Sequence, residues 1–210
     1  MRVSRAQADE NRRTVIDVAS RLFREKGFDG IGLNDLMKGA GLTQGGFYKQ
    51  FRSKEDLVVQ ATAKALEQGS AKWADLLAAR NPLRALIGFY LSEVHREELA
   101  GGCAVAALGP EAARRSPALR QAFEAGIKSQ LEALDDLATP APGENVRDKS
   151  LVTLATMVGA LILSRAVADE RLSKRVLRAA TEALLRNAPG GDAPRTRRAA
   201  SSDKPGRAVS

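Results

Sequence analysis

Residues 41–58 read GLTQGGFYKQFRSKEDLV, and this stretch decides the fold class. Thr43 is a good N-cap residue, so a short helix is expected over residues 44–50. Phe47 and Phe51 stand four residues apart and can therefore point to the same side. The stretch predicts a short helix that buries one aromatic edge and leaves its other face free.

A second short helix is expected just before it, over residues 33–40. Its apolar residues share one face: Leu33, Leu36, Met37 and Ala40. Gly41 ends this helix, so only a short glycine-containing turn separates the two helices. Two short helices joined in this way are typical of the helix-turn-helix motif, which we place at residues 32–51.

Longer helices flank this motif. Residues 11–26 are amphipathic and are followed by Gly27, which predicts a helix that ends there. Ser53 and the acidic residues after it resemble a capping box, and the helix that they open is expected to run to about Gln68. Five of the nine aromatic residues lie within the first 51 positions. We expect this part to be compact and to have a small core of its own.

The rest of the chain also has helical patterns. Helices are expected to begin at Asn81-Pro82 and at Ser116-Pro117, where an N-cap residue precedes a proline. After a loop at 139–145, two more are expected over 148–168 and 173–187. Aromatic residues make up only 4% of the chain, and alanine and leucine are abundant. We expect an all-α protein of about nine helices with no strand.

The composition excludes several functional classes. One cysteine and one histidine are too few for a cysteine-based zinc site or a histidine-rich metal centre. No phosphate-binding glycine loop or nucleophile motif occurs, so neither an enzyme nor a cofactor is expected. No apolar run of about 18 residues and no apolar signal segment occur. A cytoplasmic protein with no membrane contact is therefore expected, and its net charge of +8 favours a polyanionic partner.

Residues 189–210 contain three of the eight prolines and almost no large apolar side chain. Such a segment cannot bury enough surface to offset its ordering entropy, so we interpret it as a disordered basic tail. It is either an inert solubilising end or an arm whose arginines add salt-sensitive DNA affinity.

The helix over residues 44–50 begins with small residues. Gly45 and Gly46 each cost about 1 kcal/mol relative to alanine in a helix, which is unfavourable unless a surface must come close. Thr43 and Gln44 would place a hydroxyl, an amide and free backbone N–H groups at the positive end of the helix dipole. That arrangement suits phosphates and base edges.

This part of the sequence resembles the TetR family of bacterial transcription regulators (TetR/AcrR-like). Residues 41–57 are similar to the family pattern G-[VL]-[ST]-x-G-x-[LIF]-Y-x-[HY]-F-x-[SN]-K-[ED]-[ED]-L. They depart from it at Gln50, where the family usually has histidine, although glutamine can still donate and accept. VIDVASRLFREKGFDG at 15–30 resembles the family's first helix and Gly-aromatic turn. The resemblance covers residues 9–69 and implies a three-helix DNA-binding domain there. It further implies a helical domain for ligand binding and dimerisation over residues 70–188.

The resemblance also implies roles for single residues. Tyr48 would hydrogen-bond a phosphate, and Lys49 and Lys54 would neutralise others, although each could instead be solvated or packed. The start of the helix would face bases or adjacent phosphates in the major groove through Thr43, Gln44, Gly45 and Gly46, and Gln44 could pair with adenine. The family usually has hydroxyl residues before its second helix, where this chain has Ile31-Gly32. Asn34 could substitute for them.

In the family the second domain forms the dimer. Residues 150–164 are uncharged and contain the small residues Ala155, Gly159 and Ala160. Together with the last helix they could form a four-helix interface across a two-fold axis. The alternative is an ordinary helix buried within one chain.

An effector pocket would use the larger or chemically distinctive side chains of this domain: Trp73, Phe89, Tyr90, Cys103 and Phe123. His95 stands beside three charged residues and is expected at a helix end on the surface. Cys103, in GGCAVAALGPE, resembles a Gly-Cys segment of some TetR-like regulators, including ones that sense electrophiles. A lone free cysteine is, however, usually a small buried hydrophobe.

The leading hypothesis is a homodimeric transcriptional repressor that binds a palindromic DNA operator and is released by a small molecule of unknown identity. One alternative is a helical protein that binds nucleic acid without sequence preference. Another is a thiol-based sensor of electrophiles that acts through Cys103. An enzyme is not expected, because no nucleophile–base pair or paired carboxylates stand out.

Overall fold

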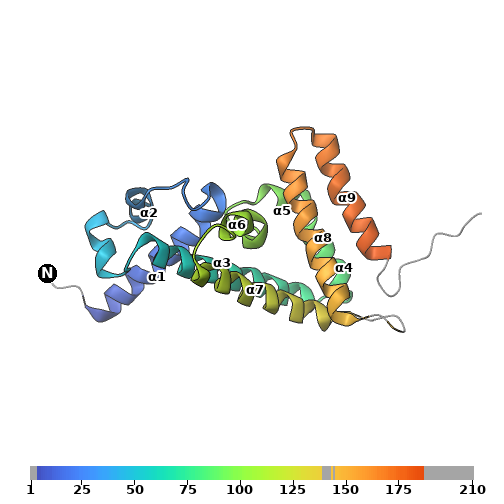
Figure 1. Cartoon of the computed structure of the whole chain (residues 1–210), viewed down its shortest axis with the longest axis horizontal. Helices are drawn as coiled ribbons and strands as arrows, with labels where there is room; N and C mark the ends of the chain where they lie inside the picture. Colours follow the sequence, from blue (N-terminus) through green and yellow to red (C-terminus); the bar gives the residue numbers. More distant parts are fainter. Residues whose placement is uncertain (1–3, 139–142, 144, 187–210) are drawn as a thin grey trace, which may run out of the picture.

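The computed structural model describes residues 4–138, 143 and 145–186 of the 210-residue chain. This part is helical and contains no strand, which confirms the all-α prediction (Figure 1). The basic tail expected at 189–210 and most of the loop expected at 139–145 lie outside the described residues. The helices are α1 (Arg5–Lys26), α2 (Leu33–Gly39), the 3₁₀ helix η1 (Gln44–Lys49), α3 (Lys54–Leu77), α4 (Pro82–Tyr90), α5 (Glu93–Glu97), α6 (Ala104–Ala112), α7 (Pro117–Asp135), α8 (Val146–Ala166) and α9 (Glu170–Arg186).

Three predicted helix starts are confirmed at the level of single hydrogen bonds. The side-chain oxygens of Ser53, Asn81 and Ser116 accept from the backbone N–H three residues ahead, at 3.1–3.3 Å. Each bond satisfies a donor that the first turn of a helix cannot pair internally. Proline follows two of these caps, at the first helical position, as expected.

The third α-helix is longer than predicted. It does not end near Gln68 but continues through Gly69 to Leu77. It runs beside α7 along most of the molecule (Figure 1). The two helices lie very close at Gly126 of α7, where an added Cβ would stand 2.8 Å from Leu66 Cδ2, so only glycine fits there. One helix therefore connects the helix-turn-helix end of the molecule to the opposite end.

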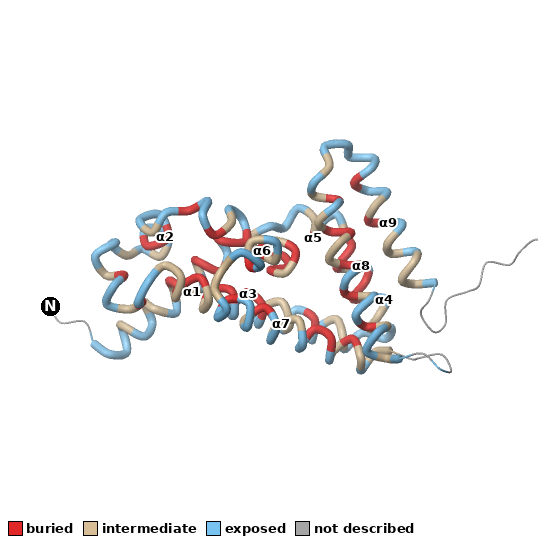
Figure 2. Tube along the Cα trace, in the orientation of Figure 1, coloured by how far each residue is buried: buried red, intermediate tan, exposed pale blue. Residues whose placement is uncertain are grey.

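The N-terminal helices do not have a core of their own, contrary to expectation. Their buried side chains continue into α6 and the first half of α7 through Leu108, Leu119 and Phe123. A second cluster lies between α3, α4, α7, α8 and α9 around Tyr90 and Met157. Figure 2 shows the buried residues following α3 and α7 through both regions. The helix-turn-helix is therefore packed directly on the C-terminal part.

The helix expected to begin at Asn81-Pro82 ends at Tyr90, and a separate short helix, α5, follows it. The Ser92 hydroxyl donates to the carbonyl of Phe89 and accepts from the N–H of His95. A serine that satisfies both ends in this way stops one helix and starts the next. The chain turns at this point, which rotates His95 relative to α4.

Helix α8 is long and apolar enough to cross a membrane by length and composition, the one such helix in the described ranges. Core helices meet the same two criteria. Here α8 packs against α4, α5, α6, α7 and α9, and 33% of its most apolar stretch is buried.

Candidate DNA-binding surface and effector cavity

The helix-turn-helix is held by a tight turn and one aromatic anchor. Gly41 has φ of +70°, a conformation that favours glycine, and it lets the N–H of Leu42 reach the carbonyl of Met37 at 2.9 Å. Phe47 of η1 is fully buried and stacks on Phe51, with 5.2 Å between ring centroids. These contacts fix which face of η1 points outward.

The outward face of η1 carries most of the residues that the sequence singled out. Thr43, Gln44, Gly45 and Lys49 are exposed. Tyr48 is 72% exposed, and its ring touches Phe47 edge-on at 5.1 Å. The tyrosine is therefore braced on one side while its hydroxyl faces solvent. Thr43 occupies the N-cap position, but its side chain makes no capping bond, which leaves that hydroxyl free.

Neither glycine of η1 is required by the fold. A Cβ added at Gly45 would meet no atom within 4 Å, and one at Gly46 would meet only Met37 Cε at 3.9 Å. Helical glycine is unfavourable relative to alanine, and here no neighbour inside the chain explains it. The small side chains leave the backbone of η1 open to an external surface.

Lys54 and Asn34 lie at the edges of this face. The Lys54 ammonium is half-buried and donates to the carbonyl of Ile31 at 2.8 Å, so it ties α3 to the segment before α2. Two of its N–H donors remain. Asn34 is exposed near the start of α2, whose N-cap Gly32 has no side chain to offer.

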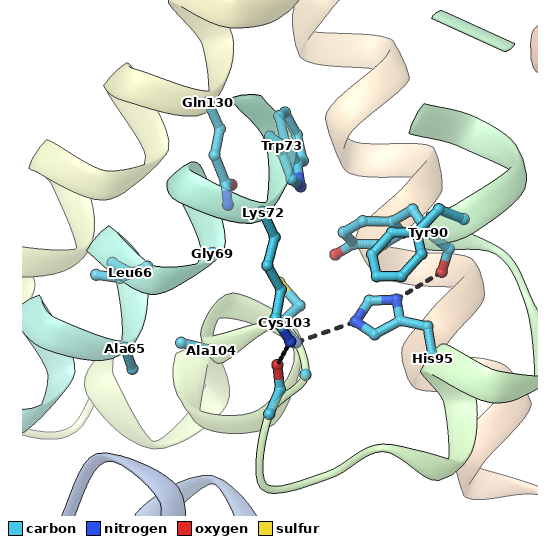
Figure 3. A pocket seen from close by; sticks show the side chains of 13 residues that line it. Ala65, Leu66, Gly69, Lys72, Trp73, Tyr90, His95, Cys103, Ala104 and Gln130 are labelled. Carbon is cyan, nitrogen blue, oxygen red and sulfur yellow. Dashed lines mark hydrogen bonds between the residues drawn. The ribbon is translucent and has the colours of Figure 1, made fainter. Parts of the chain in front are cut away.

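A cavity lies between α3, α4, α7 and the segment that leads into α6, and it is partly open to solvent. Its free volume for a water-sized guest is about 20 Å³, so a larger guest requires the walls to move. Four of the five expected pocket residues line it: Trp73, Phe89, Tyr90 and Cys103. The fifth, Phe123, does not line it but is buried in the first core cluster beside Leu119, because α7 turns that face toward α3 and α6. Figure 3 shows the labelled side chains around the cavity.

The expectation that His95 lies on the surface is wrong. Its ring is buried and makes two hydrogen bonds to the backbone (Figure 3). Nδ1 donates to the carbonyl of Tyr90 at 2.7 Å, and Nε2 accepts from the N–H of Cys103 at 3.1 Å. Accepting at Nε2 requires the neutral tautomer with its proton on Nδ1. Burial first, then Arg165 and Lys72, lower the pKa of His95, with the Tyr90 bond and Glu98 opposing. The imidazole thus joins the end of α4 to the start of α6.

Three polar side chains of the cavity lining were not predicted there: Lys72, His95 and Gln130. Gln130 gave a usable signal, because it stands seven residues after Phe123 on the apolar face of α7, where a polar residue needs a reason. Lys72 gave none, since one lysine on a helix is normally solvated.

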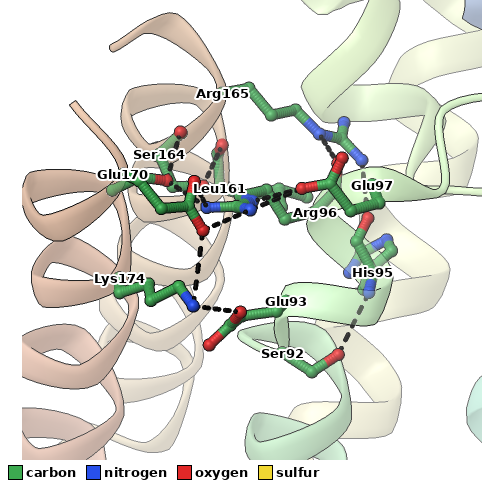
Figure 4. A network of polar contacts seen from close by, with 11 residues as sticks. Ser92, Glu93, His95, Arg96, Glu97, Leu161, Ser164, Arg165, Glu170 and Lys174 are labelled. Carbon is green, nitrogen blue, oxygen red and sulfur yellow. Dashed lines mark hydrogen bonds and ion pairs between the residues drawn. The ribbon is translucent and has the colours of Figure 1, made fainter. Parts of the chain in front are cut away.

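A polar network fixes α5 against α8 and α9 (Figure 4). Arg96 donates to Glu170 and to the hydroxyl of Ser173 at the start of α9. Hydrogen bonds to Glu170 and Glu97 raise the pKa of Arg96. Arg165 of α8 donates to the carbonyls of residues 95, 96 and 98. The cavity wall formed by His95 is therefore anchored from behind.

A helix-turn-helix with an exposed recognition segment, joined to a helical domain that contains a cavity, defines a class of DNA-binding regulators. The chain belongs to the TetR family of bacterial regulatory proteins. The family model for its N-terminal domain matches residues 15–61, and the tetracycline repressor-like C-terminal domain matches residues 78–180.

Named relatives agree with this. The transcriptional regulator LmrA of Bacillus subtilis is 27% identical over 74% of this chain and 86% of its own length. A TetR regulator from Chloroflexus aurantiacus has a solved structure with a TM-score of 0.73, is 28% identical, and covers 85% of this chain and 94% of its own. AibR, solved in complex with isovaleryl coenzyme A and operator DNA, has a TM-score of 0.58 at 15% identity, over 83% of this chain and 97% of its own.

Proposed function

We propose that the chain is a cytoplasmic, homodimeric repressor that binds a two-fold-symmetric DNA operator and leaves it when a small molecule occupies the cavity. The observation that carries this is the outward face of η1, where Tyr48 stands exposed above two glycines that the fold does not need. A backbone open to close approach, with a hydroxyl, an amide and a lysine around it, suits a phosphate-lined groove.

The dimer is supported by one face of α8. Leu151, Val152 and Leu163 are 44%, 64% and 57% exposed, and a Cβ at Gly159 between them would meet nothing. Ala160, expected in the interface, instead faces the core at 7% exposure. A run of exposed apolar side chains with small residues is what a helix-to-helix contact with a second copy needs.

Coupling between cavity and DNA would run through α6. This helix follows the cavity residue Cys103, and its far end contacts the DNA-binding domain, where Glu111 accepts from the N–H of Phe28 at 3.1 Å. Gly27 leaves room for that carboxylate, since an added Cβ would stand 2.8 Å from Glu111 Oε1. A molecule that displaces the start of α6 would therefore shift α1. AibR, which shares the fold, has been solved in complex with both isovaleryl coenzyme A and operator DNA.

The direct test is footprinting of genomic fragments retained by the protein at about 150 mM salt, where weak ionic contacts are screened. A discrete protected site with two-fold symmetry supports the proposal. Uniform binding that disappears with salt would indicate the alternative, a protein without sequence preference.

A pair of variants sharpens this test. Tyr48→Phe combined with Gln44→Ala should abolish the preference for the protected site, and under the nonspecific alternative it should change little. The control is Tyr90→Phe, which removes the phenolic hydroxyl of the only other tyrosine, a residue buried far from η1. It should leave DNA binding unchanged.

A second candidate function is sensing of electrophiles by Cys103. The observation in its favour is that this free cysteine is 8% exposed and borders the cavity, so an electrophile that enters could reach its sulfur. Treatment with iodoacetamide, followed by intact mass and DNA binding, tests it. Release of DNA that requires modification and is absent in Cys103→Ser would establish this function.

A further inference from the structure

The cavity contains two buried polar atoms without a hydrogen-bond partner. Tyr90 and Gln130 are 1% and 4% exposed, and the Tyr90 hydroxyl and Gln130 Oε1 make no hydrogen bond. In the described residues only six side-chain atoms have this status, and two of them line one cavity. Such atoms are unfavourable in a folded protein, and their presence requires an explanation.

Both residues line the cavity. In Figure 3 the Tyr90 ring carries its oxygen toward Trp73 and Cys103, and the Gln130 amide extends beside Trp73. Burial, and secondarily the Cys103 sulfur, raise the pKa of Tyr90 well above its usual value, so the phenol is a neutral donor. A thiol is only a weak partner for it. The cavity thus offers one O–H donor and one amide oxygen acceptor.

Four aromatic rings lie in the walls around these atoms. Trp73 and Tyr90 meet edge-to-face at 6.3 Å, and the Phe89 ring stacks on His95 at 5.4 Å. Both nitrogens of His95 are already bonded to backbone, so it presents only ring surface. Flat side chains of this kind suit a planar guest.

The cavity lining carries one cation, Lys72, and no anion. No aspartate or glutamate lines the cavity, so a cationic molecule would find no counter-ion. Lys72 is exposed, and its ammonium donates to the carbonyl of Gly101 at 2.7 Å at the edge of the cavity (Figure 3). A carboxylate inside would lose its water without a fully buried partner, which is costly.

We infer that the cavity binds small neutral aromatic molecules bearing a hydroxyl or N–H group, that is, phenol-like compounds, whose ring lies among Trp73, Phe89 and Tyr90 and whose polar group bonds Gln130 and Tyr90. This names the effector class and rests on the proposed function only for its consequence at DNA. A hydroxyl can donate to an amide oxygen or accept from a phenol, so it suits either orphan atom.

Three probes of matched shape test the chemistry: 4-methylphenol, 4-methylbenzoate and 1,4-dimethylbenzene. Trp73 is the only tryptophan of the chain and lies in the cavity wall, so its fluorescence reports occupancy of the full-length protein directly. We expect 4-methylphenol to bind about tenfold more tightly than 1,4-dimethylbenzene, the ratio typical of one good hydrogen bond to an otherwise unpaired group. We expect 4-methylbenzoate to bind most weakly.

Two variants test whether Gln130 and Tyr90 cause the preference for 4-methylphenol over 1,4-dimethylbenzene. Gln130→Leu and Tyr90→Phe should each remove most of the tenfold preference while leaving 1,4-dimethylbenzene binding about unchanged. Because each also removes an unpaired buried polar atom, the thermal midpoint of the free protein should stay equal or rise. Gln121→Leu, the same change at an exposed position of α7, should leave the preference intact.

Three outcomes would overturn the inference: no binding by any probe, equal binding of 4-methylphenol and 1,4-dimethylbenzene, or a preference for 4-methylbenzoate. Loss of thermal stability in both variants would also overturn it, since that would show a structural role for both groups. DNA release is measured separately. Selective 4-methylphenol binding without release supports the site and contradicts the proposed function alone.

Discussion

Arg24, near the end of α1, donates from Nη1 to the carbonyl of Gly102, 3.0 Å away and 78 residues later in the chain. The arginine is 5% exposed, and its other donors reach the carbonyl of Ser20 and the side chain of Gln68. Gly102 directly precedes Cys103 of the cavity wall, and an added Cβ there would stand 2.2 Å from the carbonyl oxygen of Glu98. One buried guanidinium thus bonds the DNA-binding domain to the rim of the cavity.

Removal of this guanidinium should weaken the whole fold. Arg24→Met keeps an apolar stem but leaves the Gly102 and Gln68 oxygens without their donor, so we expect the free energy of unfolding to fall by about 2–4 kcal/mol. Urea unfolding measures this. Arg21→Met removes an exposed arginine from the same helix and should change stability by less than about 0.5 kcal/mol. Equal effects of the two variants would contradict the structural role of Arg24.

Replacing Gly45 with alanine should raise the stability of the protein and lower its affinity for DNA. Because an added Cβ meets nothing inside the chain, Gly45→Ala should raise the free energy of unfolding by about 0.5–1 kcal/mol. If η1 approaches DNA closely, the same methyl should lower operator affinity about tenfold or more, the cost of losing one or two contacts. Gly88→Ala, also in open space but on α4, should stabilise without changing DNA binding. Full affinity in Gly45→Ala would show that close approach is not needed.

His95 should make stability depend on pH. The pKa of His95 in the folded protein lies below its value of about 6.5 in the unfolded chain. Between these two values the unfolded chain therefore binds more protons than the folded one. The free energy of unfolding should therefore decrease as the pH falls through about 6.5, by at most about 1.4 kcal/mol per pH unit. This decrease should end below the pKa of His95 in the folded protein.

The chain has one histidine, which makes this test direct. Thermal midpoints of the wild type, taken between about pH 7.5 and about pH 5.5, should fall, whereas those of His95→Gln should fall less across the same window. Parallel curves for the two proteins would mean that His95 is not held neutral in the fold.

A charge on the exposed face of α8 should dissociate the proposed dimer. Val152→Glu would bury a carboxylate from each copy in an apolar contact, so we expect the dimer dissociation constant to rise at least about 100-fold. Sedimentation velocity measures this. Val94→Glu makes the same change on α5, where the side chain is 76% exposed, and should leave assembly unaltered. A monomeric wild type, or an unaffected Val152→Glu, would argue against this interface.

The sequence predicted those parts of the fold that depend on neighbours along the chain. The caps at Ser53, Asn81 and Ser116, the turn at Gly41 and the buried edge of η1 follow from local rules, and they are found as expected. The exposed residues of η1 around Tyr48 follow from the position of its buried edge. Its contact with DNA stays a prediction.

Features of the fold that depend on residues distant in the sequence could not be predicted from such local rules. His95 was misplaced because its neighbours are charged, whereas its position is decided by the Ser92 turn and by Cys103 eight residues later. Phe123 has the size of a pocket residue, but the rotation of α7 against α3 and α6 places it in the core. The shared core around α6 is equally a matter of tertiary packing.

The length of α3 has a mechanical consequence. Lys54, which bonds the segment before α2, and Trp73, in the cavity wall, belong to the same unbroken helix and stand about 28 Å apart along its axis. A rod of that length magnifies rotation, so a tilt of about 5° at the cavity end moves the other end by about 2.5 Å. In a two-fold dimer the two displacements add to about 5 Å, against a half-site spacing of about 34 Å. A molecule as small as a single ring could then misalign both recognition segments, and no helix would have to unfold.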